Sequence, residues 1–180
     1  MLSKKMEKAL NTQVNNEFYS AYLYMSMSAY CQSMGLKGIA NWFMVQFHEE
    51  MFHAMKFYEY ILRKGGKVSL QTIKQPPVEF GTPLSMFEQT YEHEQFITKC
   101  INDLVETARQ EKDNATEIFL HWYVTEQIEE EENDTDMIAQ LKFIGKDTSA
   151  LLMFDKELAA RMTTIPTEFS KGVEAALKGA

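Results

Sequence analysis

The segment Gln46-Phe47-His48-Glu49-Glu50-Met51-Phe52-His53 carries the pattern on which the fold of this chain depends. It lies in a long stretch without Gly or Pro and contains a Glu-x-x-His pair, Glu50 and His53. On a helix, this spacing places both side chains on one face, one turn apart. Apolar residues flank the pair at steps of three and four, and the whole stripe is Ile39, Phe43, Gln46, Glu50, His53, Phe57 and Tyr60. A carboxylate and an imidazole on a core-facing stripe must be neutralised or must bind something.

Composition limits the classes of protein to consider. The chain has 180 residues, 45% of them hydrophobic, which suits one domain with a sizeable core. The formal net charge of −8 argues against nucleic acid as a partner. The first residues form no apolar signal region, and no run reaches the length of a membrane span, so we expect a cytoplasmic protein without a membrane partner. Cys31 and Cys100 fall far apart in helical segments, and we expect both thiols to be reduced.

Hydrophobic periodicity predicts an all-α fold, a four-helix bundle over residues 3–145. Ser3 and Thr82 are predicted N-caps, Asn114 is a candidate cap for the fourth helix, and Gly35 and Gly145 mark helix ends. The four long helices are predicted at about residues 3–34, 37–64, 83–112 and 115–144.

The remaining segments connect or follow the bundle. Residues 67–82 contain Pro76-Pro77 and are too many for a tight turn, so we expect a long crossover between the second and third helices. A short fifth helix is predicted over 148–162. The tail, residues 163–180, holds Pro166 and a weakly amphipathic segment, to which the sequence assigns no role.

The other three long helices also carry polar groups in the middle of apolar stripes. The stripe of the first is Leu10, Val14, Glu17, Ala21, Tyr24 and Ser28; that of the third is Phe87, Thr90, Glu94, Ile97, Ile101, Leu104 and Ala108; that of the fourth is Leu120, Tyr123, Gln127, Glu130, Asp134, Met137, Leu141 and Ile144. Packed as a bundle, the midpoints of the four helices meet at one level. We therefore expect four carboxylates and one imidazole to converge in the core.

Burying these groups without a partner would be costly, and like charges would raise the pKa values of the carboxyls. A divalent cation supplies the missing positive charge. Oxygen-rich ligation with one imidazole suits iron or manganese, with zinc as a competitor. The alternative is a buried polar network that only fixes the register of the helices.

Four motifs in this pattern resemble those of a ferritin of the haem-free prokaryotic kind. They are Asn16-Glu17-Phe18-Tyr19, His48-Glu49-Glu50-Met51-Phe52-His53, Tyr91-Glu92-His93-Glu94 and Glu126-Gln127-Ile128-Glu129-Glu130-Glu131. The resemblance covers about residues 3–160. It implies a ferritin-like di-iron domain over residues 1–162, in the class of bundles that hold metal between facing helices.

By this resemblance, Glu17, Glu50 and His53 would hold one iron, and Glu50 would bridge to a second. The second iron would be held by Glu94 and Glu130, with Gln127 in contact but not a full ligand. A third iron site is implied at Glu49, Glu126, Glu129 and Glu130, for which a solvated acidic face is the alternative reading.

Tyr24 lies two turns beyond Glu17 and resembles the tyrosine that ferritins keep beside the iron pair. It could donate a hydrogen bond or an electron, although packing alone would also account for it. Trp122 is a similar candidate, for which core filling is the simpler account. Asp113, Glu117 and His121 are candidates for an iron entry route.

Two departures from related patterns bear on function. The di-iron family often has a second Glu-x-x-His on the fourth helix, where this chain has Gln127 and Glu130. The weaker Gln ligand favours release of product iron into a store. Met51 matches a position where bacterioferritins bind haem, but the absent second His argues against that class, and no haem is expected.

The resemblance implies iron storage with ferroxidase activity, in which Fe(II) is oxidised by O₂ or H₂O₂ and ferric mineral is deposited in a homo-oligomeric cage of 24 subunits. The alternatives are a di-iron oxygen- or peroxide-reducing enzyme of the rubrerythrin type, and a purely structural bundle. Neither cysteine forms the Cys pair of a rubredoxin-like domain.

Overall fold

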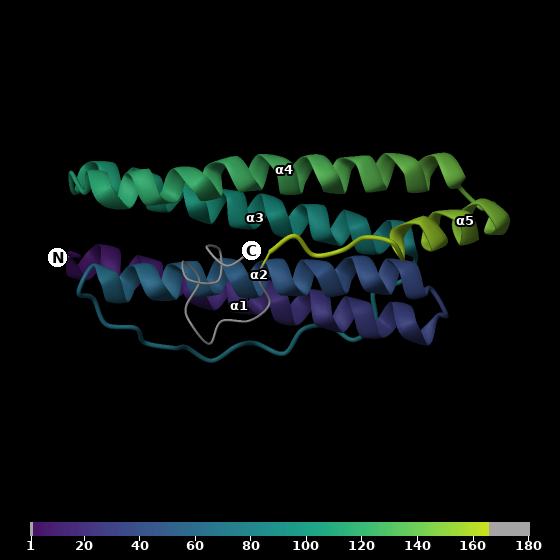
Figure 1. The fold of residues 1–180 in the computed structure, drawn as a ribbon, viewed down its shortest axis with the longest axis horizontal. Helices are drawn as coiled ribbons and strands as arrows, with labels where there is room; N and C mark the ends of the chain where they lie inside the picture. The colour runs from purple at the N-terminus through teal and green to yellow at the C-terminus, as the bar shows by residue number, and fades with distance from the viewer. Residues whose placement is uncertain (1, 166–180) are drawn as a thin grey trace.

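The computed structural model describes residues 2–165, and this part of the chain contains five helices and no strand. The helices are α1 (Lys4–Ser33), α2 (Lys37–Arg63), α3 (Pro83–Gln110), α4 (Asn114–Ile144) and α5 (Thr148–Leu158). Helices α1 to α4 form a long bundle, and α5 folds back at one end of it (Figure 1). The predicted all-α bundle with a short fifth helix is confirmed. The described helices include none long and apolar enough to cross a membrane.

Local sequence sets most of the helix ends as predicted. The hydroxyl of Ser3 accepts a hydrogen bond from the backbone N–H of Met6 at 3.0 Å, and Thr82 accepts one from Ser85 at 3.2 Å. Gly35 and Gly145 adopt positive φ angles of 79° and 58°, which glycine tolerates better than other residues at the end of a helix.

Two details differ from the prediction. Asp113, rather than Asn114, is the N-cap of α4, and both of its carboxylate oxygens accept from Thr116. Helix α5 ends at Leu158, four residues before the predicted end. The chain turns there, and the backbone carbonyls of Leu158 and Arg161 accept hydrogen bonds from the side-chain amide of Asn41 on α2. Tertiary contacts with α2 therefore replace the last predicted turn of α5.

The bundle consists of two helix pairs, α1 with α2 and α3 with α4 (Figure 1). Residues 64–82 connect the pairs and run along the length of the bundle beside α1, as predicted. Asn11 anchors the start of this crossover through the backbone of Lys67 and Ser69, at 2.9 and 2.6 Å. Ser26 anchors its end by donating to the carbonyl of Pro77 at 2.6 Å.

The apolar stripes face inward and form two clusters, one toward each end of the bundle. One cluster includes Tyr24, Phe43 and Phe87, and the other includes Leu10, Phe57 and Ile101. Buried polar side chains separate them, and those expected from the stripes are Glu17, Gln46, Glu50, His53, Glu94, Gln127, Glu130 and Asp134. The convergence of polar groups inside an otherwise apolar core is thus present in the folded chain.

Candidate metal centre

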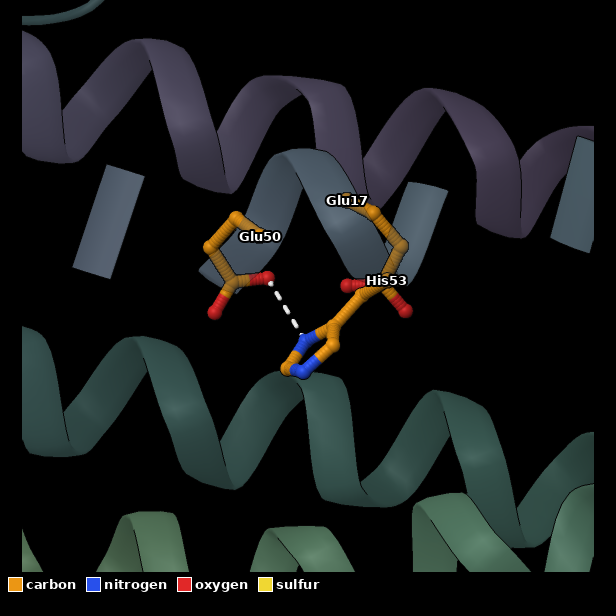
Figure 2. A group of neighbouring side chains, drawn as sticks. All are labelled: Glu17, Glu50 and His53. Atoms are coloured by element: carbon orange, nitrogen blue, oxygen red, sulfur yellow. Dashed lines mark ion pairs between the residues drawn. The ribbon is translucent and has the colours of Figure 1, made fainter. Parts of the chain in front are cut away.

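Glu17, Glu50 and His53 form the first group of potential ligands. Glu17 comes from α1 and the other two from α2, and the three side chains point toward one another (Figure 2). One ligand atom from each lies within 4.8 Å of the others, so a single ion could contact all three. Oε2 of Glu50 lies 3.3 Å from Nδ1 of His53. Gln13, one turn before Glu17, donates to Oε1 of Glu17 at 2.9 Å and so orients that carboxylate.

A second group shares His53 and adds two glutamates of α4, Glu126 and Glu130. Oε1 of Glu126 lies 3.6 Å from Nε2 of His53, too far for a hydrogen bond. The amide of Gln46 on α2 donates to Oε2 of Glu130 at 2.8 Å. His53 therefore stands between two sets of carboxylates, with a different ring nitrogen toward each.

Glu94 lies outside these two groups, although it is buried at the same level on α3. The hydroxyl of Tyr24 donates to Oε1 of Glu94, and the amide of Gln127 donates to Oε2 at 3.0 Å. The amide of Gln127 also lies 3.3 Å from Oγ1 of Thr98. The carboxylate of Glu94 is thus held by hydrogen-bond donors from α1 and α4.

The glutamates expected at a third site are only partly brought together. Glu126 joins the group of His53 and Glu130, whereas Glu49 and Glu129 belong to neither group. Glu49 instead accepts a hydrogen bond from the guanidinium of Arg161 at 2.9 Å. Burial is the main cause that raises the pKa of Glu49, and the charges of Glu126 and of the exposed Glu129 add to it.

Burial dominates the electrostatics of the centre. It raises the pKa of Glu50 to about 7, against the lowering effect of His53, and the pKa of Glu130 to about 8, with Glu94 adding to the increase. Burial, followed by the charge of Glu50, raises the pKa of Glu17 well above its usual value. For His53, burial lowers the pKa, but Glu50, Glu126 and Glu17 together outweigh it and the net pKa is raised. The metal-free centre therefore favours protonated groups.

Among residues 2–165, two buried atoms of the centre have no hydrogen-bond partner, Oε2 of Glu17 and Nε2 of His53. Buried polar atoms are nearly always paired, so two orphaned polar atoms in one centre call for a further group. Carboxylate oxygens and one imidazole are the donors that iron or manganese takes, with zinc as a competitor. The residues present therefore fit a divalent cation.

Three residues close to the centre were not among the predicted site residues. Gln46 and Asp134 lie on the predicted stripes, so the signal for both was the polar residue in an apolar row. Asp134 is 1% exposed, and its Oδ2 has no hydrogen-bond partner among the residues that the structure describes. Arg161 lies after α5, where no periodicity points toward the site.

The other candidates lie farther from the chemistry or serve packing. Asp113 caps α4 and pairs with Lys64 at 3.2 Å. Glu117 pairs with Arg109 at 2.7 Å and lies 3.8 Å from His121. Trp122 packs edge-on against His53, with ring centroids 5.4 Å apart, and Lys56 lies over its ring.

The bundle and its buried carboxylates define the class of helical proteins that hold metal between facing helices. Residues 7–144 match the family model of the ferritin-like domain. The non-heme ferritins of Staphylococcus aureus (strain USA300) and Staphylococcus epidermidis are 42% and 44% identical over 161 residues, which is 89% of this chain and 97% of each relative. This chain belongs to the ferritin family.

Solved ferritins of Archaeoglobus fulgidus have the same fold. One was engineered into a closed form and aligns with a TM-score of 0.90, covering 91% of this chain and all of its own. Another, described as a novel open pore ferritin, aligns with a TM-score of 0.89 and covers 90% of this chain. Both are 52% identical to this chain.

Proposed function

We propose that this chain stores iron. It would oxidise Fe(II) to Fe(III) at the centre between its helices and deposit the ferric product inside a cytoplasmic shell of 24 copies, with residues 1–162 as the iron-handling domain. The observation that carries the proposal is the group of Glu17, Glu50 and His53, whose ligand atoms lie close together. Within the described part of the chain, the buried Oε2 of Glu17 and Nε2 of His53 have no hydrogen-bond partner. Membership of the ferritin family supports the same reading.

In this proposal, Fe(II) is the substrate and the protein supplies ligands and a place for protons. Glu17, Glu50 and His53 bind one Fe(II), and Glu50, Glu94 and Glu130 bind a second. Because the pKa values of Glu50 and Glu130 are raised to about 7 and 8, part of the carboxyl population must lose protons when cations enter. Each Fe(II) then gives one electron to the oxidant, O₂ or H₂O₂. The oxidant takes up protons as it is reduced, but hydrolysis of the Fe(III) product by water to ferric oxide releases more, so iron uptake should acidify the medium.

Weak ligands at the centre would favour release of the Fe(III) product. Gln127 offers an amide where a carboxylate would bind Fe(III) more firmly, and its nitrogen is already committed to Glu94. Glu49, Glu126, Glu129 and Glu130 would form a third iron site through which iron moves toward the interior of the shell. A single bundle cannot enclose a mineral, so storage requires the assembled cage.

The test combines aerobic addition of excess Fe(II) with size-exclusion chromatography and an iron assay per chain. We expect a very large assembly that holds many irons per chain. Glu50→Ala should slow Fe(II) oxidation by about a hundredfold or more, since it removes the shared ligand, while the assembly persists. Glu92→Ala removes an exposed carboxylate of α3 and should leave the rate unchanged.

Unimpaired oxidation in Glu50→Ala would overturn the ligand assignment. A small species with two irons per chain would instead favour an oxygen- or peroxide-reducing enzyme of the rubrerythrin type. A small species without iron would favour a structural bundle.

A further inference from the structure

Arg161, in the segment after α5, lies against α2. Its Nη2 donates to Oε1 of Gln46 at 2.6 Å and to Oε2 of Glu49 at 2.9 Å. Its Nη1 lies 3.4 Å from the carbonyl oxygen of Trp42, and the guanidinium stands 4.7 Å above the ring of Trp42. The side chain of Arg161 is only 24% exposed, so this arrangement is partly shielded from solvent.

Both side-chain acceptors of Arg161, Gln46 and Glu49, connect to the metal centre. Glu49 is a proposed ligand of the third iron site. Gln46 accepts from Arg161 through its oxygen and donates through its nitrogen to Oε2 of Glu130 at 2.8 Å. Because Arg161 can only donate, it fixes the orientation of the Gln46 amide that faces Glu130. The guanidinium is thus linked to two of the carboxylates at the third site.

The positive charge of Arg161 opposes the effects that raise the pKa of Glu49. Burial and the neighbouring charges of Glu126 and Glu129 raise the pKa of Glu49, whereas Arg161 lowers it. A permanently charged guanidinium therefore balances a carboxylate in an acidic cluster. An incoming cation at Glu49 would meet this positive charge at hydrogen-bond distance and would have to replace it.

We infer that Arg161 is a built-in counter-cation of the third iron site, which occupies Glu49 while the site is empty and is displaced when iron binds there. The inference rests on the proposed function. Its consequence is that iron binds weakly at Glu49 and stays briefly, as a transit position requires. Arg161 is a positioning residue in this scheme, since it acts on iron through Glu49 and Gln46.

A purely structural role for Arg161 makes the opposite prediction. If the guanidinium only held Glu49 in place, its removal would weaken iron binding at the third site. The segment has separate anchors, because Asn41 donates to the backbone carbonyls of Leu158 and Arg161 at 3.2 and 2.9 Å. The side chain of Arg161 can therefore be changed without removing the contacts that dock the segment on α2.

The experiment is an anaerobic calorimetric titration of the assembled, full-length protein with Fe²⁺. In Arg161→Gln we expect the dissociation constant of the third Fe²⁺ per chain to fall about tenfold, since a nearby positive charge is lost, while the first two remain within about twofold. Arg161→Lys keeps the charge and should stay near the unmodified protein. Lys142→Gln removes a cation that is paired with Glu88 at the surface, and it controls for a change in net charge alone.

Trp42 provides a second readout of the displacement. In a Trp122→Phe background, Trp42 is the single tryptophan. This variant is titrated with Zn²⁺ while the tryptophan emission is recorded. The third Zn²⁺ per chain should change the emission of Trp42 as the guanidinium of Arg161 leaves the indole ring. The same titration of Arg161→Gln in that background should show no such change.

A third-site dissociation constant that rises or stays the same in Arg161→Gln would overturn the inference. Unaltered Trp42 emission in the chain that retains Arg161 would do so as well. If the unmodified protein binds no Fe²⁺, the proposed function fails with it. Three bound Fe²⁺ with no response to Arg161→Gln would leave the proposed function intact.

Discussion

The phenol of Tyr24 on α1 donates its hydroxyl hydrogen to the carboxylate of Glu94 on α3, and both side chains are buried at the level of the metal centre. The ring of Tyr24 stacks on Phe43, with centroids 6.1 Å apart, and meets the edge of His93. Burial, followed by the charge of Glu94, raises the pKa of Tyr24 well above its usual value. The phenol therefore stays protonated and remains a hydrogen-bond donor.

Tyr24→Phe separates this hydrogen bond from packing. The ring keeps its neighbours, but Oε1 of Glu94 loses its donor and the centre loses a phenol that could give up an electron. We expect the initial rate of Fe(II) oxidation, measured by stopped-flow absorbance, to fall about tenfold while the number of Fe²⁺ bound per chain is unchanged. An unaltered rate would assign Tyr24 to packing alone.

Asp134 lies one turn beyond Glu130 on α4 and is almost fully buried, and no group in residues 2–165 forms a hydrogen bond with its Oδ2. Burial, with the charge of Glu94 as the next cause, raises its pKa to about 9. The folded chain thus retains a proton that the unfolded chain releases above about pH 4. The folded chain therefore has its full stability from the protonated Asp134 below about pH 4, and it loses that stability progressively as the pH rises toward 9.

Asp134→Asn should remove this dependence. In metal-free protein we expect the free energy of unfolding at pH 7 to increase by roughly 2 to 4 kcal/mol, with little gain near pH 4. Urea unfolding across this pH range measures the effect, and Asp136→Asn serves as an exposed control on the same helix. A gain that does not vary with pH would show that Asp134 is not the titrating group.

The helices and the buried polar side chains between the two apolar clusters could be predicted because one rule governs both. A helix packed on one face repeats its buried positions every three or four residues, so Glu17, Glu94 and Glu130 fall on predicted stripes and are buried together. The rule weakens at the end of α4, where Ile138 rather than Met137 is buried. The repeat of buried positions does not decide between Asp113 and Asn114 as the N-cap of α4, because both residue types cap helices well.

Contacts made by side chains outside the periodic helices could not be predicted. The pairing of Glu49 with Arg161 depends on where the chain turns after α5, and Asn41 on α2 fixes that turn. The grouping of Glu126 with His53 and Glu130 depends on rotamers at an interface between helices, which sequence spacing does not encode. The tail was predicted to be weakly amphipathic, and all of it beyond residue 165 lies outside the described residues.

Helix α2 begins without a cap of its own, since its N-cap residue, Leu36, has no side-chain acceptor. Asp155 on α5 supplies the missing cap from another helix, because its Oδ1 accepts a hydrogen bond from the backbone N–H of Ile39 at 2.8 Å. Gly38 makes this approach possible. A Cβ there would overlap the carbonyl oxygen of Asp155 and lie 3.0 Å from the amide nitrogen of Ala159, both of which are backbone atoms.

Gly38→Ala therefore sets two effects against each other. Alanine favours a helix by about 1 kcal/mol over glycine, whereas overlap with the backbone of α5 must move that helix and release the cap from Asp155. We expect the clash to dominate, with a net loss of about 2 kcal/mol and faster hydrogen exchange in α5. Lys37→Ala, at the exposed neighbouring position, should not destabilise the protein. A more stable Gly38→Ala variant with unchanged exchange in α5 would show that α5 does not dock this closely on α2.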